Sequence, residues 1–180
     1  MFLWLQATDQ RTTVFNDWSS FLSGLIFLVG AIICFTYYRK IGDRGGISST
    51  ILWTGIANTL YFLGSVSWTY YVYFKGVETP YPSFGDIFFI LMPVAYAFCV
   101  GSLLQIYRSS TKPSTWVTAV VVFAALAYLM FVFVGNSEIS NELPFRENFF
   151  NFAYTLSDSI YVGAGVALLL IAGGRIYKGI

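Results

Sequence analysis

Residues 80–107, PYPSFGDIFFILMPVAYAFCVGSLLQIY, decide the fold. They open with a proline-rich turn, and Ser83 followed by Asp86 three positions later matches the capping box of a helix start. The stretch is then almost entirely apolar up to the basic residue Arg108. About 20 apolar residues are enough for a helix to cross a bilayer. This stretch therefore predicts a membrane-spanning helix with a carboxylate in its first turn.

The composition of the whole chain extends this prediction to the other helices. The chain has 180 residues, of which 57% are hydrophobic and only 11% are charged. Soluble domains carry about 25% charged residues, so a soluble globular domain is excluded. We expect a single all-α domain, residues 1–180, folded as a polytopic bundle of about five transmembrane helices.

Turn and cap residues set the expected helix bounds. An interfacial segment, 1–16, is anchored by Trp4, and Asn16 or Asp17 can cap the first helix. Ser48, Ser49 or Thr50 can start the second helix. The last helix is longer than a bilayer requires. The five expected helices cover residues 17–38, 49–73, 83–107, 114–134 and 145–177.

The basic residues indicate an orientation. Seven of the 10 Lys and Arg residues fall at one set of helix ends: Arg39, Lys40, Arg44, Arg108, Lys112, Arg175 and Lys178. Because positively charged loops stay on the cytoplasmic side, the C-terminus should face the cytoplasm and the N-terminus should face out. Loops 75–82 and 135–144 would then lie outside. We expect a multi-pass protein of the plasma membrane.

The second and third helices predict one hairpin, and the fourth and fifth predict another. In both, the returning helix carries an aspartate with an aromatic residue three positions later, Asp86 with Phe89 and Asp158 with Tyr161. Both returning helices also exit through Ile-Tyr and a basic residue. These features indicate a repeated helical hairpin, with chance similarity between apolar segments as the alternative.

Two motifs resemble a known group of membrane modules. The run YPSFGD at 81–86, followed by an apolar helix with Pro93, is similar to their Pro-Ser-x-x-Asp signature, and AYTLSD at 153–158 resembles their later Tyr-x-x-x-Asp element. Such modules precede diguanylate cyclase, cyclic-di-GMP phosphodiesterase and archaeal histidine kinase domains. The resemblance covers about residues 50–177 and implies a sensory function. It departs in span number, and no catalytic domain follows before Ile180.

The two aspartates are the main candidate site residues. Asp86 can cap its own helix start, where its charge also suits the helix dipole, or it can bind a ligand or a proton. Asp158 lies well inside the last helix, where an acid at the bilayer centre costs about 2.5–3.5 kcal/mol. It should face the bundle interior, be protonated or hold a polar partner. An interhelical hydrogen bond and a ligand, ion or proton site both remain open for Asp158.

Four further residues complete the candidate ligand-binding set. Asn58 is the most plausible cross-helix partner of Asp158, and Tyr154 and Tyr161 share its helix face by spacing. Trp68 belongs to aromatic residues that either frame an outward cleft between the two outer loops or form an ordinary interfacial belt.

The sequence also limits the chemistry. It has no His, and Cys34 and Cys99 lie in apolar helix stretches that suit small packing residues. No nucleophile–base pair, phosphate loop or metal-ligand cluster is present. We therefore expect no enzymatic activity, no metal site, no cofactor and no nucleic-acid partner. The expected partners are the lipid bilayer, other membrane subunits or a second copy of the chain, and a small ligand.

Three functions remain open at this point. The first is a sensor-like, ligand-binding membrane module that passes a signal through its last helix. The second is a structural subunit of a membrane complex, and the third is a small transporter or channel.

Overall fold

The computed structural model describes residues 13–77, 80–107, 113–130, 132–133 and 143–176. These residues contain no strand, and the predicted all-α fold is confirmed. Five long helices and one short π-helical turn make up the fold: α2 (Thr13–Ile41), α3 (Gly46–Tyr70), η1 (Tyr71–Lys75), α4 (Phe84–Tyr107), α5 (Pro113–Met130) and α7 (Phe145–Ile176).

Two of the expected helix starts are wrong. α2 begins at Thr13, so the proposed caps Asn16 and Asp17 lie inside the helix. The expected interfacial segment therefore overlaps α2 at its end, and its residues 1–12 lie outside the described part of the chain. α3 begins at Gly46, before the expected serines. Its preceding residue, Gly45, has a φ of +57°, a conformation that glycine adopts without the strain of a side chain.

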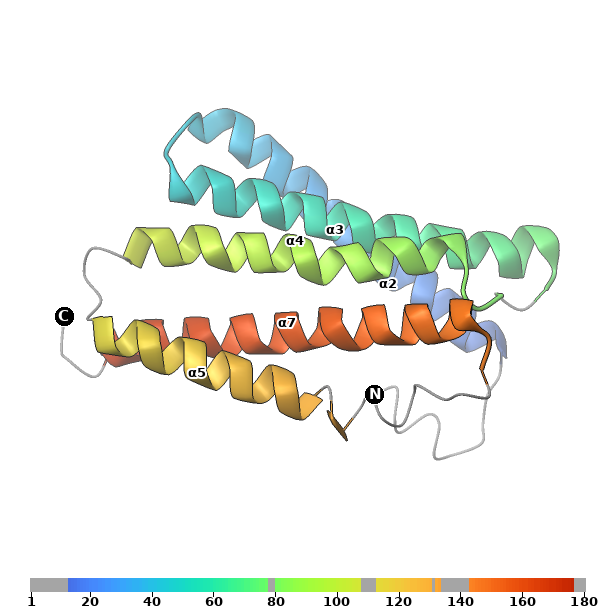
Figure 1. Cartoon of the computed structure of the whole chain (residues 1–180). Helices are drawn as coiled ribbons and strands as arrows, with labels where there is room; N and C mark the ends of the chain where they lie inside the picture. Colours follow the sequence, from blue (N-terminus) through green and yellow to red (C-terminus); the bar gives the residue numbers. More distant parts are fainter. Residues whose placement is uncertain (1–12, 78–79, 108–112, 131, 134–142, 177–180) are drawn as a thin grey trace.

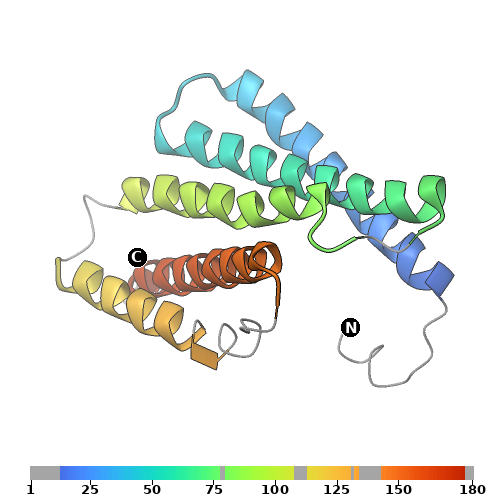
Figure 2. The same cartoon turned by 45° about the vertical axis from the view of Figure 1, so that its right-hand side comes forward.

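The helices pack in a simple order. α3 lies between α2 and α4, α7 packs on α4, and α5 packs on α7. α2, α4 and α7 run in one direction, and α3 and α5 run in the other (Figure 1). Figure 2 shows the α5–α7 pair to one side of the α3–α4 pair. Both expected hairpins are thus packed helix pairs.

Glycines allow close contact within these pairs. A Cβ added at Gly64 of α3 would lie 2.8 Å from the Phe89 ring of α4. A Cβ added at Gly163 of α7 would lie 2.4 Å from the Phe123 ring of α5. Glycine at these two positions therefore allows the paired helices to approach closely.

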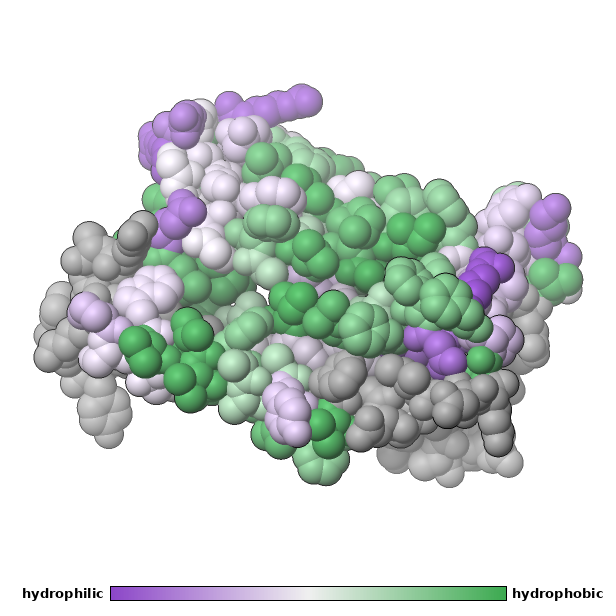
Figure 3. Space-filling view, viewed as in Figure 1, coloured by the Kyte–Doolittle hydropathy of each residue, from purple (hydrophilic) through white to green (hydrophobic). Residues whose placement is uncertain are grey.

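The distribution of side chains is the reverse of that in a soluble domain. Among the side chains that the structure describes, the buried apolar ones are Ala31, Ala57, Ala95 and Cys99, all small. Large apolar side chains lie outside instead, and Ile26 is 71% exposed. Figure 3 shows a broad apolar surface over the middle of the molecule, with hydrophilic residues gathered toward the two ends of the helices.

The length and composition of some helices also favour a membrane protein. Two segments of the described chain, Phe21–Ile41 and Phe84–Ile106, are long and apolar enough to cross a membrane, and Trp116–Leu129 is a shorter apolar helix. Core helices of soluble proteins can pass the same test of length and composition. The finding is therefore weak support for membrane association.

Candidate functional site

Asp86 is the most buried charged side chain among the described residues, with 2% of its surface exposed. It lies in the first turn of α4, and its Oδ2 atom accepts hydrogen bonds from the backbone N–H and the hydroxyl of Ser83, the latter at 2.7 Å. The carboxylate-to-N–H bond is one half of a capping box. In the other half of a capping box, the serine hydroxyl accepts a hydrogen bond from a backbone N–H of the first turn. Here the Ser83 hydroxyl instead donates to the Asp86 carboxylate. The predicted capping contact of Asp86 is therefore present.

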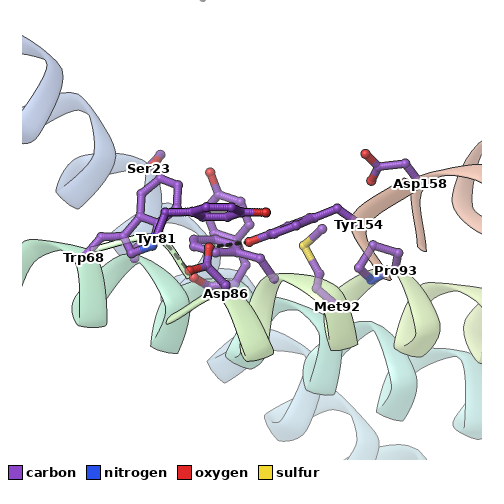
Figure 4. Close-up of a pocket in the computed structure, with 11 residues that line it drawn as sticks. Ser23, Trp68, Tyr81, Asp86, Met92, Pro93, Tyr154 and Asp158 are labelled. Atoms are coloured by element: carbon purple, nitrogen blue, oxygen red, sulfur yellow. Dashed lines mark hydrogen bonds between the residues drawn. The ribbon is translucent and has the colours of Figure 1, made fainter. Parts of the chain in front are cut away.

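The second carboxylate oxygen of Asp86 joins α4 to α7. The hydroxyl of Tyr154 donates a hydrogen bond to Asp86 Oδ1 at 2.6 Å (Figure 4). Spacing alone placed Tyr154 beside Asp158, but its hydroxyl bonds the other aspartate. Asp86 thus accepts three hydrogen bonds from uncharged donors, which is how a carboxylate is satisfied when it is buried without a cation.

The turn before α4 is also held against α7. The Tyr81 hydroxyl donates to Asn151 Oδ1. The guanidinium of Arg146 donates to the carbonyl of Pro82 at 3.1 Å. Together with the Tyr154–Asp86 bond, these contacts join α7 at three points to the proline-rich turn and the first turn of α4.

One more polar contact follows along the same pair of helices. The Ser157 hydroxyl donates to the carbonyl of Ile90 at 2.9 Å. This carbonyl lies three residues before Pro93, which has no N–H to give to the carbonyl of Phe89. α4 nevertheless runs without interruption through Pro93. The polar contacts between α4 and α7 therefore extend over more than one helical turn.

A cavity of about 570 Å³ opens beside these contacts. α2, α3, α4, α7 and the proline-rich turn all contribute to its wall. Its volume is within the range of about 300–1,000 Å³ that is typical of small-molecule sites. The lining residues are Ser23, Tyr61, Ser65, Trp68, Tyr81, Asp86, Phe89, Met92, Pro93, Tyr154 and Asp158.

Asp158 lies in this wall one helical turn beyond Tyr154 on α7. Figure 4 shows Tyr154 extending toward Asp86, with Asp158 on the far side of Tyr154. The side chain of Asp158 is exposed rather than packed between helices. Within the described part of the chain it forms no hydrogen bond or ion pair. Asp158 therefore faces the cavity, but it is not packed in the interior between the helices as an inward-facing acid would be.

Asn58 does not pair with Asp158, and that prediction is wrong. Its Oδ1 atom accepts a hydrogen bond from the hydroxyl of Tyr96 at 2.8 Å, and its side chain packs against Gly30. The reason is the packing order, because α4 lies between α3 and α7. The ring of Tyr161 contacts the ring of Tyr96 at a centroid distance of 5.6 Å. Neither Asn58 nor Tyr161 lines the cavity.

Trp68 lines the cavity from α3 and packs edge-on to Phe89, with ring centroids 4.9 Å apart. Its indole is accommodated by Gly85, where an added Cβ would lie 2.9 Å from the Trp68 ring. The indole Nε1 atom is buried and has no hydrogen-bond partner among the described residues. Trp68 therefore belongs to the cavity wall.

The sequence alone did not single out several residues of this site. Ser23, Ser65 and Met92 line the cavity, and nothing in their local sequence distinguishes them from packing residues. Asn151 and Arg146 carried a weak signal, because polar side chains near the start of an apolar helix need partners. The outer cleft was expected between loops 75–82 and 135–144. Tyr81 of the first loop lines the cavity. The second loop falls mainly on residues 134–142, which lie outside the described residues.

No family model, no curated protein and no solved structure matches the chain. The fold and the geometry of the cavity are therefore the observations on which a function is proposed.

Proposed function

We propose that the protein is an integral membrane protein that binds a small ligand in the cavity and passes the resulting change through α7. The observation that carries this proposal is the cavity of about 570 Å³, with the carboxylate of Asp158 in its wall. The protein would cross the plasma membrane five times, with its N-terminus outside and its C-terminus in the cytoplasm.

The membrane part of the proposal rests on the surface of the molecule. Large apolar side chains face outward on α2 and α5, and the buried polar side chains are nearly all small or hydrogen-bonded. α7 has 32 residues, so at 1.5 Å per residue its length is about 48 Å, which exceeds the roughly 30 Å of a bilayer core. One end of α7 would therefore extend beyond the lipid, or the helix would tilt strongly.

The transmission part rests on Tyr154. This residue lines the cavity and also donates the hydrogen bond that joins α7 to Asp86 of α4. A ligand that fills the cavity must therefore contact the side chain that links the two helices. The resemblance of the motifs at 81–86 and 153–158 to sensor modules agrees with this arrangement, because both motif aspartates border the cavity.

A cavity-filling variant tests the proposal. Ser23→Trp places a large ring into the cavity from α2, and Ile26→Trp places the same ring on the exposed side of that helix. The purified full chain in nanodiscs would be heated with a library of cationic, neutral and anionic small metabolites. We expect at least one compound to raise the Tm of the wild type and of Ile26→Trp, but not of Ser23→Trp. Equal behaviour of all three proteins with every compound would overturn the proposal.

A second candidate function is a structural subunit of a membrane complex. The outward face of α5 favours it, because Val117, Val120 and Val121 are 60–63% exposed and offer a continuous apolar surface. Mild solubilisation followed by mass measurement distinguishes the two. A structural subunit should co-purify with another membrane protein at fixed stoichiometry. A charged residue at Val120 should release that partner protein without changing the Tm shifts described above.

A further inference from the structure

The wall of the cavity has a distinct charge pattern. Two carboxylates, Asp86 and Asp158, line it, and no Lys or Arg is among its described lining residues. Arg146 lies near the proline-rich turn, but its guanidinium donates to the Pro82 carbonyl and does not line the cavity. An anionic ligand would therefore meet negative charge without a compensating cation from the described lining.

The two carboxylates are not equivalent. Asp86 is buried and already accepts hydrogen bonds from Ser83 and Tyr154 at both oxygens. Asp158 is exposed to the cavity and accepts no hydrogen bond from the described residues. Asp158 is thus the group whose charge is available to a ligand, and Asp86 holds the wall in place.

The remaining wall is rich in aromatic residues. Five of the lining residues have aromatic rings, namely Tyr61, Trp68, Tyr81, Phe89 and Tyr154. Tyr61 and Trp68 both meet the Phe89 ring, at centroid distances of 5.5 and 4.9 Å, so these three rings form one connected aromatic wall. Aromatic rings attract organic cations through their electron-rich faces, and the effect grows where water is excluded.

We infer that the cavity takes an organic ammonium compound, with its cationic group held between the carboxylate of Asp158 and the aromatic rings of the wall. This inference rests on the proposed ligand-binding function and names the charge class of the ligand. A positive ligand supplies the opposite charge to the unpaired carboxylate of Asp158, whereas a neutral ligand supplies none.

Choline and its uncharged isostere 3,3-dimethyl-1-butanol separate charge from shape. Their binding to the full chain in nanodiscs would be measured by calorimetry. We expect choline to bind at least tenfold more tightly than the alcohol. Asp158→Asn should weaken choline binding about tenfold and leave the alcohol unaffected. Glu147→Gln, which removes an acid from the same helix outside the cavity, should change neither affinity.

A measurement on the unaltered protein guards against misfolding of the variant. A hydrophobic carbodiimide should modify Asp158, and mass spectrometry of the digested protein should show that choline slows this modification while the alcohol does not. Equal binding of the two compounds, equal protection by both, or no choline binding at 10 mM, about the limit of useful affinity, would overturn the inference. Binding of the alcohol alone would overturn the cation class and leave ligand binding standing, whereas failure of the whole metabolite library would overturn both.

Discussion

The hydroxyl of Tyr154 on α7 lies 2.6 Å from Oδ1 of Asp86 on α4 and donates a hydrogen bond to it. The two residues are 68 positions apart in the chain, and this bond joins the first turn of α4 to a residue of α7 that lines the cavity. Asp86 is buried, so the bond cannot be exchanged for one to bulk water.

Tyr154→Phe should therefore destabilise the protein. It removes one of three donors to a buried carboxylate and leaves the ring in place, which should cost about 1–2 kcal/mol of the free energy of unfolding. Tyr161→Phe is the matched control on the same helix, because the Tyr161 ring contact with Tyr96 does not need the hydroxyl. Steric trapping in bicelles measures both values. Equal effects of the two variants would contradict the assigned role of Tyr154.

The two aspartates should respond differently to the same substitution. Asp86→Asn replaces an oxygen that accepts hydrogen bonds by an NH₂ group that can only donate, so it should cost about 2–3 kcal/mol. Asp158→Asn should change the free energy of unfolding by less than about 0.5 kcal/mol, because its carboxylate has no described partner to lose. A large destabilisation by Asp158→Asn would show that this residue holds the helices together rather than serving the cavity.

Gly163 and Gly165 provide a test of the α5–α7 contact. An added Cβ at Gly163 would lie 2.4 Å from the Phe123 ring, whereas nothing described lies within 4 Å of one at Gly165. Gly163→Ala should cost about 1–3 kcal/mol through overpacking. Gly165→Ala should stabilise the helix by about 0.5–1 kcal/mol, because glycine is a poor helix former. Thermal unfolding of the two variants measures these changes in stability, and we expect them to have opposite signs.

Asn58 should matter for stability and not for binding. Its side chain is 8% exposed and accepts a hydrogen bond from the Tyr96 hydroxyl. A double-mutant cycle with Asn58→Ala and Tyr96→Phe should give a coupling energy of about 0.6 kcal/mol, the average for interhelical hydrogen bonds in membranes, and no more than about 1.7 kcal/mol. Choline affinity should stay unchanged in Asn58→Ala. A coupling energy near zero would remove this bond from the account of α3–α4 packing.

Local patterns were sufficient to predict the helices and the helix-start role of Asp86. The apolar lengths of the chain predicted five helices, and Ser83 with Asp86 predicted the contact at the start of α4. The cavity was harder to predict, because its wall combines side chains from α2, α3, α4 and α7. Spacing on a single helix correctly placed Tyr154 near Asp158 but could not reveal that its hydroxyl reaches Asp86 on another helix.

The prediction that Asn58 pairs with Asp158 was wrong for the same reason. The position of a residue along its own helix says nothing about which helices are neighbours. α4 separates α3 from α7, and Tyr96 supplies the partner that Asp158 was expected to provide. The early start of α2 at Thr13 has a different cause: polar residues such as Asn16 and Asp17 resemble caps, yet they are also tolerated in the first turns of a helix.

The parallel course of α4 and α7 limits how the two helices can move against each other. Four polar ties, from Arg146, Asn151, Tyr154 and Ser157, join α7 to α4 and its preceding turn. A shift of α7 along its axis by even one residue, about 1.5 Å, would strain all four hydrogen bonds together. A swing of the far end of α7 about this anchored segment would keep them. Under the proposed function, a change at the cavity would therefore tilt α7 about this segment rather than shift it along its axis.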